Sequence, residues 1–288
     1  MSWLQLIPIQ WLKRLKWLAI GYLLVCGTLW LGQERLLFWP SAKLARTPEK
    51  QGLAYEDVWL SVAVGNGETE RLHGWWIPGE ADRQAPVLLY LHHNAVNVGA
   101  NLSQAKDFHD LGYSVLLIDY RGFGRSEGGY PTESRVYQDA DAAWNYLTQT
   151  LDIAAKRIII YGHSMGSAIA IDLAARQPQA GALIVQNGFT SLRDMTKRFG
   201  LFWLFPMDLL LRPKFDSFRK IDRVAVPVLF VHGMRDPQIP YSMSQRLFAA
   251  AAEPKQLLLL PEEGHDNNMG TDDLAMIDSF VRRALTKD

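Results

Sequence analysis

Residues 158–175 read IIIYGHSMGSAIAIDLAA, and this stretch decides the fold. It opens with an uninterrupted apolar run, which is typical of a strand buried on both faces of a parallel sheet. From Ser164 onward it continues with the small and apolar residues of a buried helix. At the junction stands Gly162-His163-Ser164-Met165-Gly166, a G-x-S-x-G pattern. In this strand–turn–helix context the pattern predicts a nucleophile elbow.

The two glycines of the pattern allow a strand to turn into a helix within a few residues. Gly162 and Gly166 lack the Cβ atoms that would collide with neighbouring backbone. Ser164 is then expected in a strained conformation at the start of a helix. The N–H groups and the dipole at that helix end favour the negative charge that develops during acyl transfer. A chance glycine-rich turn is the alternative, and the flanking strand and helix patterns disfavour it.

A nucleophilic serine needs a base, and the base needs an acid that orients it. Of the seven histidines, His265 follows the last predicted strand and can reach over the carboxyl edge of the sheet to Ser164. Asp236 follows another strand at the same edge, although a turn-forming aspartate before proline is the alternative for it alone. The chain order Ser164, Asp236, His265 matches that of elbow enzymes. We therefore predict a nucleophile, an acid and a base in that order.

The other candidates for these roles are weaker. The side chain of His163 is expected to point away from the serine, and His232 is expected to be structural. The strand end at Gln186-Asn187-Gly188, where some enzymes of this architecture carry the acid, has no carboxylate. That absence favours Asp236.

Acyl transfer also needs two N–H donors for the oxyanion. The first is expected from Met165, directly after the serine. The second is expected from the loop after the strand at residues 87–91, which reads His92-His93-Asn94-Ala95-Val96-Asn97. We predict the backbone N–H of Asn94. A helix N-terminus capped by an asparagine of this loop is compatible with that assignment.

The rest of the chain alternates short apolar runs with helical patterns. This predicts an α/β fold with a doubly wound, mostly parallel sheet, and a leading hairpin with the turn Gly65-Asn66-Gly67 adds an antiparallel edge. The predicted strands cover residues 56–64, 71–77, 87–91, 114–118, 158–161, 182–185, 228–231 and 256–260. The predicted helices cover residues 97–110, 134–151, 164–177, 241–252 and 272–287.

One interval interrupts the alternation. No strand is predicted between Asn187 and Pro227, but residues 199–211 read FGLFWLFPMDLLL. A long insertion in a compact domain is usually functional. We expect a helical cap at about residues 188–226 whose apolar side chains line a pocket. A helical pair that simply packs over the sheet is the plainer interpretation, and the two are compatible.

The N-terminus carries the most hydrophobic stretch, WLAIGYLLVCGTLWLG at residues 17–32, which has no charge. Lys16 can snorkel and so extend the stretch upstream, and tryptophans near both ends suit a membrane interface. The basic residues before it favour a cytoplasmic N-terminus and an exported domain. Residues 1–40 are therefore expected to be an uncleaved single-span anchor and residues 41–288 the catalytic domain. A helix lying on the membrane surface is the alternative.

Composition excludes several classes of protein. The 288 residues include 30 Lys+Arg and 30 Asp+Glu, and zero net charge argues against binding of nucleic acid through a basic field. A single cysteine excludes an internal disulfide framework and a cysteine-rich zinc site. The glycines near Arg121–Arg125 do not form a dinucleotide fingerprint, and no H-E-x-x-H is present. We predict no metal and no cofactor.

Taken together, these residues resemble the α/β-hydrolase superfamily from Glu56 to the C-terminus. The motifs that carry the resemblance are Asp119–Ser126 (DYRGFGRS), the GHSMG elbow, Phe189-Thr190-Ser191, Asp216-Ser217 and Gly264-His265. More narrowly, the chain resembles a single-span, membrane-anchored branch that includes depalmitoylating and lysophospholipid-cleaving serine hydrolases. In that branch the first loop usually reads His-Gly-Asn-Ala, whereas here His93 replaces the glycine. A side chain there is expected to narrow the oxyanion loop or shift its backbone.

The sequence thus predicts a serine hydrolase that acts on an ester, thioester or amide with an apolar acyl group. Two alternatives stay open. The same three residues could transfer the acyl group to an acceptor alcohol or amine. The chain could also be a catalytically silent module that binds a partner at the membrane, and His93 is the sequence argument for it.

Overall fold

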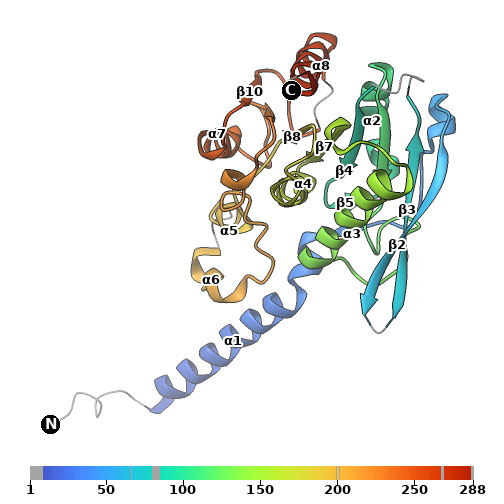
Figure 1. Ribbon diagram of the computed structural model, residues 1–288. Helices are drawn as coiled ribbons and strands as arrows, with labels where there is room; N and C mark the ends of the chain where they lie inside the picture. Colours follow the sequence, from blue (N-terminus) through green and yellow to red (C-terminus); the bar gives the residue numbers. More distant parts are fainter. Residues whose placement is uncertain are drawn as a thin grey trace.

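The computed structural model of the protein describes residues 9–65, 67–79, 85–198, 200, 202–266 and 269–286. Its centre is an eight-stranded sheet in the order β10-β9-β8-β7-β4-β6-β3-β2 (Figure 1). β2 pairs antiparallel with β3 and β3 pairs antiparallel with β6, while the remaining neighbours are parallel. The strands are β2 (Glu56–Gly65), β3 (Glu68–Ile77), β4 (Val87–Leu91), β6 (Ser114–Ile118), β7 (Ile158–His163), β8 (Ala182–Gln186), β9 (Val228–Gly233) and β10 (Lys255–Leu260). The predicted α/β fold with an antiparallel edge is confirmed; Asn66 of the predicted turn lies outside the described residues.

Helices cover both faces of the sheet, because successive side chains of a strand point to opposite faces. In β4, Val87, Leu89 and Leu91 belong to the core beneath α3 (Glu133–Asn145), α4 (Met165–Arg176) and α7 (Tyr241–Ala250). Leu88 and Tyr90 belong to the core beneath α2 (Leu102–Asp110) and α8 (Thr271–Leu285). A 3₁₀ turn at Val98–Asn101 precedes α2 and a π turn at Tyr146–Thr150 follows α3. This burial on both faces explains the continuous apolar runs in the sequence.

The segment between β8 and β9, called the cap (residues 188–226), consists of single helical turns. They are α5 (Leu192–Thr196), a 3₁₀ turn at Phe202–Leu204, α6 (Met207–Leu210) and a 3₁₀ turn at Ile221–Arg223. In the described part of the cap there is no pair of long helices. Pro206 interrupts the apolar run and Pro213 follows it, and proline disfavours helix in the residue before it and cannot donate to the helical ladder.

Helix α1 (Ile9–Leu37) leads away from the body, with the cap beside its C-terminal half (Figure 1). Residues Gln10–Leu37 form a helix that is long and apolar enough to cross a membrane. The 28 residues would extend about 42 Å, against roughly 30 Å of hydrocarbon. The apolar stretch predicted as an anchor is therefore one candidate membrane span.

A second, two-stranded sheet joins the end of α1 to the loop after β4. β1 (Trp39–Pro40) pairs in parallel with β5 (Ala95–Val96). The N–H of Trp39 donates to the carbonyl of Asn94 at 2.9 Å, and the N–H of Ser41 donates to the carbonyl of Val96 at 2.8 Å. The chain that leaves the helix is thus fixed to the loop His92–Asn97, which we call the oxyanion loop.

Candidate active site

The elbow places Ser164 between β7 and α4 in a strained conformation. Its φ is 54° and its ψ is −119°, a region that non-glycine residues rarely adopt. The N–H of Ser164 donates to the carbonyl of Gln186 on the neighbouring strand at 2.9 Å. The carbonyl of Ser164 accepts from the N–H of Ser167 at 3.0 Å, at the start of α4. These bonds on both sides fix the strained backbone, so the predicted elbow conformation is present.

Both glycines of the elbow are required by close backbone approaches. A Cβ added to Gly162 would lie 2.2 Å from the carbonyl oxygen of Gly166. A Cβ added to Gly166 would lie 2.0 Å from the carbonyl oxygen of Leu91, at the end of the central strand β4. Neither contact can be relieved by a side-chain rotation, because the opposing atoms are backbone atoms.

Gly166→Ala is accordingly expected to destabilise the fold by at least about 3 kcal/mol, since α4 or β4 must move to accept the methyl group. Thermal unfolding of the full chain in detergent measures this. Gly264→Ala is the matched control, because its added Cβ would meet nothing within 4 Å. A melting temperature for Gly166→Ala equal to that of the control would contradict the close approach.

The structure brings the three predicted catalytic side chains together. His265 Nε2 lies 3.0 Å from Ser164 Oγ, and His265 Nδ1 lies 2.7 Å from Asp236 Oδ2. With a proton on Nδ1, the imidazole donates to the carboxylate and its Nε2 accepts the serine hydroxyl. All three residues are buried at the carboxyl ends of β7, β9 and β10. This is the arrangement that turns a serine into a nucleophile.

Asp236 is held as an ionised acceptor. Its Oδ1 accepts the N–H groups of Gln238 at 2.7 Å and Ile239 at 2.9 Å, which leaves Oδ2 for His265. Burial raises the pKa of Asp236, but hydrogen bonding to His232 and His265 and to the N–H of Ile239 outweighs burial and lowers the pKa well below its usual range. A charged carboxylate at this position orients the imidazole and stabilises its protonated form.

The ring of His232 lies next to this carboxylate, with its Nε2 3.5 Å from Asp236 Oδ2. Its Nδ1 lies 2.7 Å from the hydroxyl of Ser244, and its Nε2 lies 2.9 Å from the carbonyl of Ile239. One ring nitrogen thus bonds to α7 and the other to the turn after β9. This geometry fits the structural role expected from the sequence.

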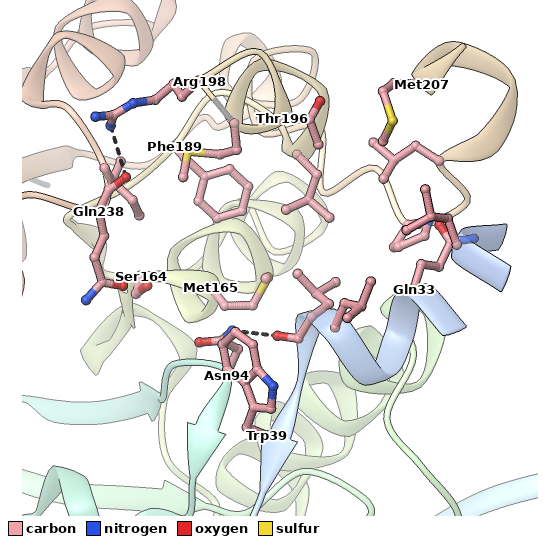
Figure 2. Close-up of a pocket in the computed structure, with 18 of the residues that line it drawn as sticks. Gln33, Trp39, Asn94, Ser164, Met165, Phe189, Thr196, Arg198, Met207 and Gln238 are labelled. Carbon is pink, nitrogen blue, oxygen red and sulfur yellow. Dashed lines mark hydrogen bonds between the residues drawn. The ribbon is translucent and has the colours of Figure 1, made fainter. Parts of the chain in front are cut away.

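Asn94 and Met165, the two predicted oxyanion donors, both lie beside Ser164 in the same pocket (Figure 2). Neither backbone N–H donates a hydrogen bond to another group in the described part of the chain. The side chain of Asn94 is directed toward the end of α1, where its Nδ2 donates to the carbonyl of Leu37 at 2.5 Å. The asparagine that caps the following helix is Asn97, whose side chain accepts from the N–H of Gly99 at 3.0 Å.

His93, the residue that departs from the family pattern, folds into the oxyanion loop. Its Nδ1 accepts the N–H of Ala95 at 3.2 Å, and its ring lies edge-on to that of His163, with centroids 5.8 Å apart. Its backbone is not in the left-handed region that would favour glycine. Among the described residues that line the pocket beside Ser164, His93 is absent. The side chain therefore closes the turn without occupying the space above the serine.

The chain is similar in sequence to known proteins. Residues 83–212 match the family model described as serine aminopeptidase, S33. The chain is 32% identical over 238 residues to the alpha/beta hydrolase domain-containing protein WAV2 of Arabidopsis thaliana, with 76% of each chain covered. The chain belongs to the α/β-hydrolase family.

Two further similarities extend over most of this α/β hydrolase. An uncharacterized protein of Mycobacterium tuberculosis (strain ATCC 25618 / H37Rv) is 36% identical over 278 residues, with 96% of each chain covered. The solved structure of the Pyrococcus furiosus esterase Pf2001 superposes with a TM-score of 0.70 at 19% identity, covering 86% of this chain and 99% of that one. At that identity the structural likeness supports the fold.

Two residues of the α/β hydrolase to which the sequence analysis gave no role in the site position the loop of His265. Asn187, which follows β8 with a φ of 48°, donates from Nδ2 to the carbonyl of His265 at 2.5 Å and accepts from the N–H of Gly233 at 3.1 Å. His163 Nε2 lies 3.0 Å from the same carbonyl. The signal for Asn187 was its place at a strand end, where we sought only a carboxylate.

Two buried histidines of the α/β hydrolase, His92 and His163, have strongly lowered pKa values. Burial, together with the neighbouring His265 and His93, lowers the pKa of His163 to about 3. Burial also lowers the pKa of His92 to about 3, with His93 as the next cause. Protonation of either ring would place a charge in the buried interior beside the candidate active site.

Acid is therefore expected to destabilise the fold through these two rings. The unfolded chain binds a proton at each near pH 6.5, whereas the folded chain does so only near pH 3. Their contribution to stability is full above pH 6.5 and is lost as the pH falls toward 3, on the order of 2 kcal/mol per histidine at pH 5. The melting temperature of His163→Phe should fall less between pH 7.5 and 5 than that of wild type or of His109→Phe, a partly exposed control. Equal declines would contradict this account.

A cluster of buried polar side chains, which includes Asp119, Arg121 and Asp139, lies next to the oxyanion loop of the α/β hydrolase. Asp119 Oδ1 accepts the N–H of Val98 at 2.8 Å and lies 3.7 Å from His92 Nε2. Arg121, in the same stretch, pairs with the buried Asp139 at 2.6 Å. Residues Asp119 and Arg121 of the stretch 119–126 therefore have structural roles beside the site.

One group of potential metal ligands lies within the described residues, namely His163, His265 and Asp266, whose ligand atoms are within 4.8 Å of one another. Ser164 and Asp236 already use both ring nitrogens of His265. A cation here would have to break the hydrogen-bonded chain of the active site. We assign no metal role to this group.

An apolar pocket of about 520 Å³ opens above Ser164 (Figure 2). The elbow and the oxyanion loop form its floor, and the cap forms one side with Phe189, Leu192 and Leu210 among its residues. This agrees with the expected role of the cap. The other side is formed by α1 and includes Leu29 and Leu36. The sequence did not predict this wall, since these residues were assigned only to the membrane anchor.

Proposed function

We propose that this α/β hydrolase is a serine hydrolase that cleaves an ester, thioester or amide of an apolar acyl group. The observation that carries the proposal is the continuous hydrogen-bonded chain from Ser164 through His265 to Asp236, at the floor of an apolar pocket. The family match and the esterase fold support hydrolysis in general.

In the acylation step, Ser164 Oγ attacks the carbonyl carbon while its proton passes to His265 Nε2. The carbonyl oxygen becomes an oxyanion, which the N–H groups of Asn94 and Met165 stabilise. The bond to the leaving alcohol, thiol or amine then breaks, and the leaving group takes the proton from His265. The product of this step is an acyl ester of Ser164.

Deacylation repeats these steps with water. His265 removes a proton from a water molecule, whose oxygen attacks the acyl carbon, and the oxyanion returns to the same two N–H groups. Collapse releases the carboxylic acid and returns the proton to Ser164 Oγ. Asp236 keeps its charge throughout and stabilises the protonated imidazole in both steps.

The anchor completes the proposal. The basic residues Lys13, Arg14 and Lys16 precede the uncharged part of α1. Retention of these residues on the cytoplasmic side places the catalytic domain on the opposite side of the membrane. The substrate is then an acylated molecule present at that surface.

The test uses the full chain in detergent with one short acyl group offered as a p-nitrophenyl ester, a thioester and an anilide. We expect release of the free acid from at least one of them, and loss of that turnover in His265→Ala. Product analysis with an added alcohol or amine separates hydrolysis from transfer to the acceptor. No turnover of any substrate would overturn the proposal and favour a silent binding module.

A further inference from the structure

One face of α1 is turned toward the cap. Tyr22, Cys26, Leu29 and Gln33 follow one another at spacings of four and three residues, which places them on a single face of a helix. Cys26 and Gln33 are buried, whereas Leu31, on another face, is 71% exposed. The helix is therefore packed against the enzyme along one side and open along the others.

Specific bonds hold this face of α1 to the cap. The side-chain amide of Gln33 donates to the carbonyl of Leu210 at 3.3 Å and accepts the N–H of Arg212 at 2.8 Å. Arg212 also pairs with Glu34 at 2.8 Å. Nearer the N-terminus of α1, the ring of Tyr22 stacks on that of Phe205, with the ring centroids 5.7 Å apart. The contact thus runs from Tyr22 to Glu34, roughly 18 Å along the helix axis.

This contact sets the depth of the cap in a bilayer. No charge lies between Lys16 and Glu34, so the segment between them is the part of α1 that hydrocarbon can cover. Tyr22 lies well inside that segment, and the cap turn that touches it must enter the membrane with it. Residues 199–207 of the cap carry no charge, and Trp203 among them is 80% exposed. Leu209, which follows Asp208, is 81% exposed. Such side chains are suited to lipid contact.

The pocket above Ser164 lies between the same two elements. Leu29 and Leu36 of α1 line it together with Met207 and Leu210 of the cap, and Ser164 belongs to the same lining. Figure 2 shows Gln33 of α1 on the same side of the pocket as Met207 of the cap. An acyl chain whose carbonyl reaches Ser164 therefore extends along α1 toward the level of the hydrocarbon.

We propose that α1 is one wall of the acyl-binding site, and that the acyl chain enters from the bilayer between α1 and the cap. This inference rests on the proposed serine hydrolase function. It makes Leu29 and Leu36 specificity-determining residues, since they meet the chain at a distance from the reacting carbonyl. The membrane helix then has a role in substrate selection besides that of a tether.

The test compares two tryptophan substitutions on the same helix. Leu29→Trp fills the pocket, whereas Leu31→Trp adds the same bulk on the exposed face. The full chain, in lipid nanodiscs, is assayed with p-nitrophenyl decanoate and p-nitrophenyl acetate. In Leu29→Trp the ratio of kcat/KM for decanoate to that for acetate is expected to fall at least about ten-fold, the loss of roughly two buried methylene contacts. In Leu31→Trp the ratio is expected to equal that of wild type.

Leu36→Trp provides a second variant should Leu29→Trp fail to fold, because Leu36 lines the pocket but is itself largely exposed and can accept bulk without repacking. The same fall in the ratio is expected for it. An unchanged ratio in the folded pocket variants, or an equal change in Leu31→Trp, would overturn the role of α1. No turnover of either ester by wild type would instead overturn the proposed hydrolase function, and this inference with it.

Discussion

Ser164→Ala is expected to lower kcat/KM for a short acyl ester by at least about 10⁴-fold while the fold stays intact. The serine oxygen is the only atom that forms the covalent intermediate in the proposed mechanism, and no neighbouring group replaces it. The hydroxyl makes its one side-chain hydrogen bond, within the described residues, to His265. Its removal therefore costs little stability.

The measurement pairs steady-state ester hydrolysis with thermal unfolding in the same detergent. Ser242→Ala, on the exposed side of α7, is the matched control and should keep wild-type activity. A Ser164→Ala variant that retains more than a hundredth of wild-type activity would remove this serine from the mechanism. A melting temperature that falls together with activity would show that the serine is structural.

Asp236→Asn is expected to lower kcat/KM by roughly 10³- to 10⁴-fold. The amide keeps the shape of the side chain, but it can turn its NH₂ group toward His265 Nδ1 and so favour the tautomer with a proton on Nε2. That tautomer cannot accept the proton of Ser164. The amide also removes the charge that stabilises the protonated imidazole.

Asp266→Asn is the control for Asp236→Asn, because it removes an exposed carboxylate next to His265 without touching the hydrogen-bonded chain. It should keep most of the activity. Equal losses in the two variants would show that the site responds to net charge and not to the orientation of the imidazole.

The three residues of the candidate triad could be placed from the sequence because each depends on a local pattern. Ser164 stands in a motif whose glycines serve one backbone turn, and the structure shows that turn. Asp236 and His265 each lie a few residues beyond the end of an apolar run, and the carboxyl ends of parallel strands meet at one edge of a sheet. The parallel order of β7, β8, β9 and β10 then brings the three side chains together.

The contribution of α1 could not be predicted in the same way. It depends on contacts between residues far apart in the chain, such as Gln33 with the carbonyl of Leu210, 177 residues away. The pairing of Trp39–Pro40 with the oxyanion loop involves a strand of two residues, too short to show a period. The sequence signal for this contact was Gln33, which directly follows the apolar stretch, because a buried side-chain amide requires hydrogen-bond partners.

The secondary structure of the cap differs from expectation for a local reason. Its apolar run was expected to belong to a helical cap or to a helical pair over the sheet, and the structure has single helical turns there. Pro206 divides the run and Pro213 follows it, and the part of the cap between Phe205 and Arg212 is held by contacts with α1. The hydrophobicity of the cap predicted that it lines a pocket, but it did not predict that α1 forms another wall of that pocket.

The most direct test of the account is labelling of the native full chain with a fluorophosphonate probe, followed by peptide mass spectrometry. The account predicts one stoichiometric adduct on Ser164, strongly slowed in His265→Ala and absent after denaturation. An unlabelled Ser164 in folded protein, or labelling that does not depend on His265, would contradict the central claim that Ser164, His265 and Asp236 act as one proton relay.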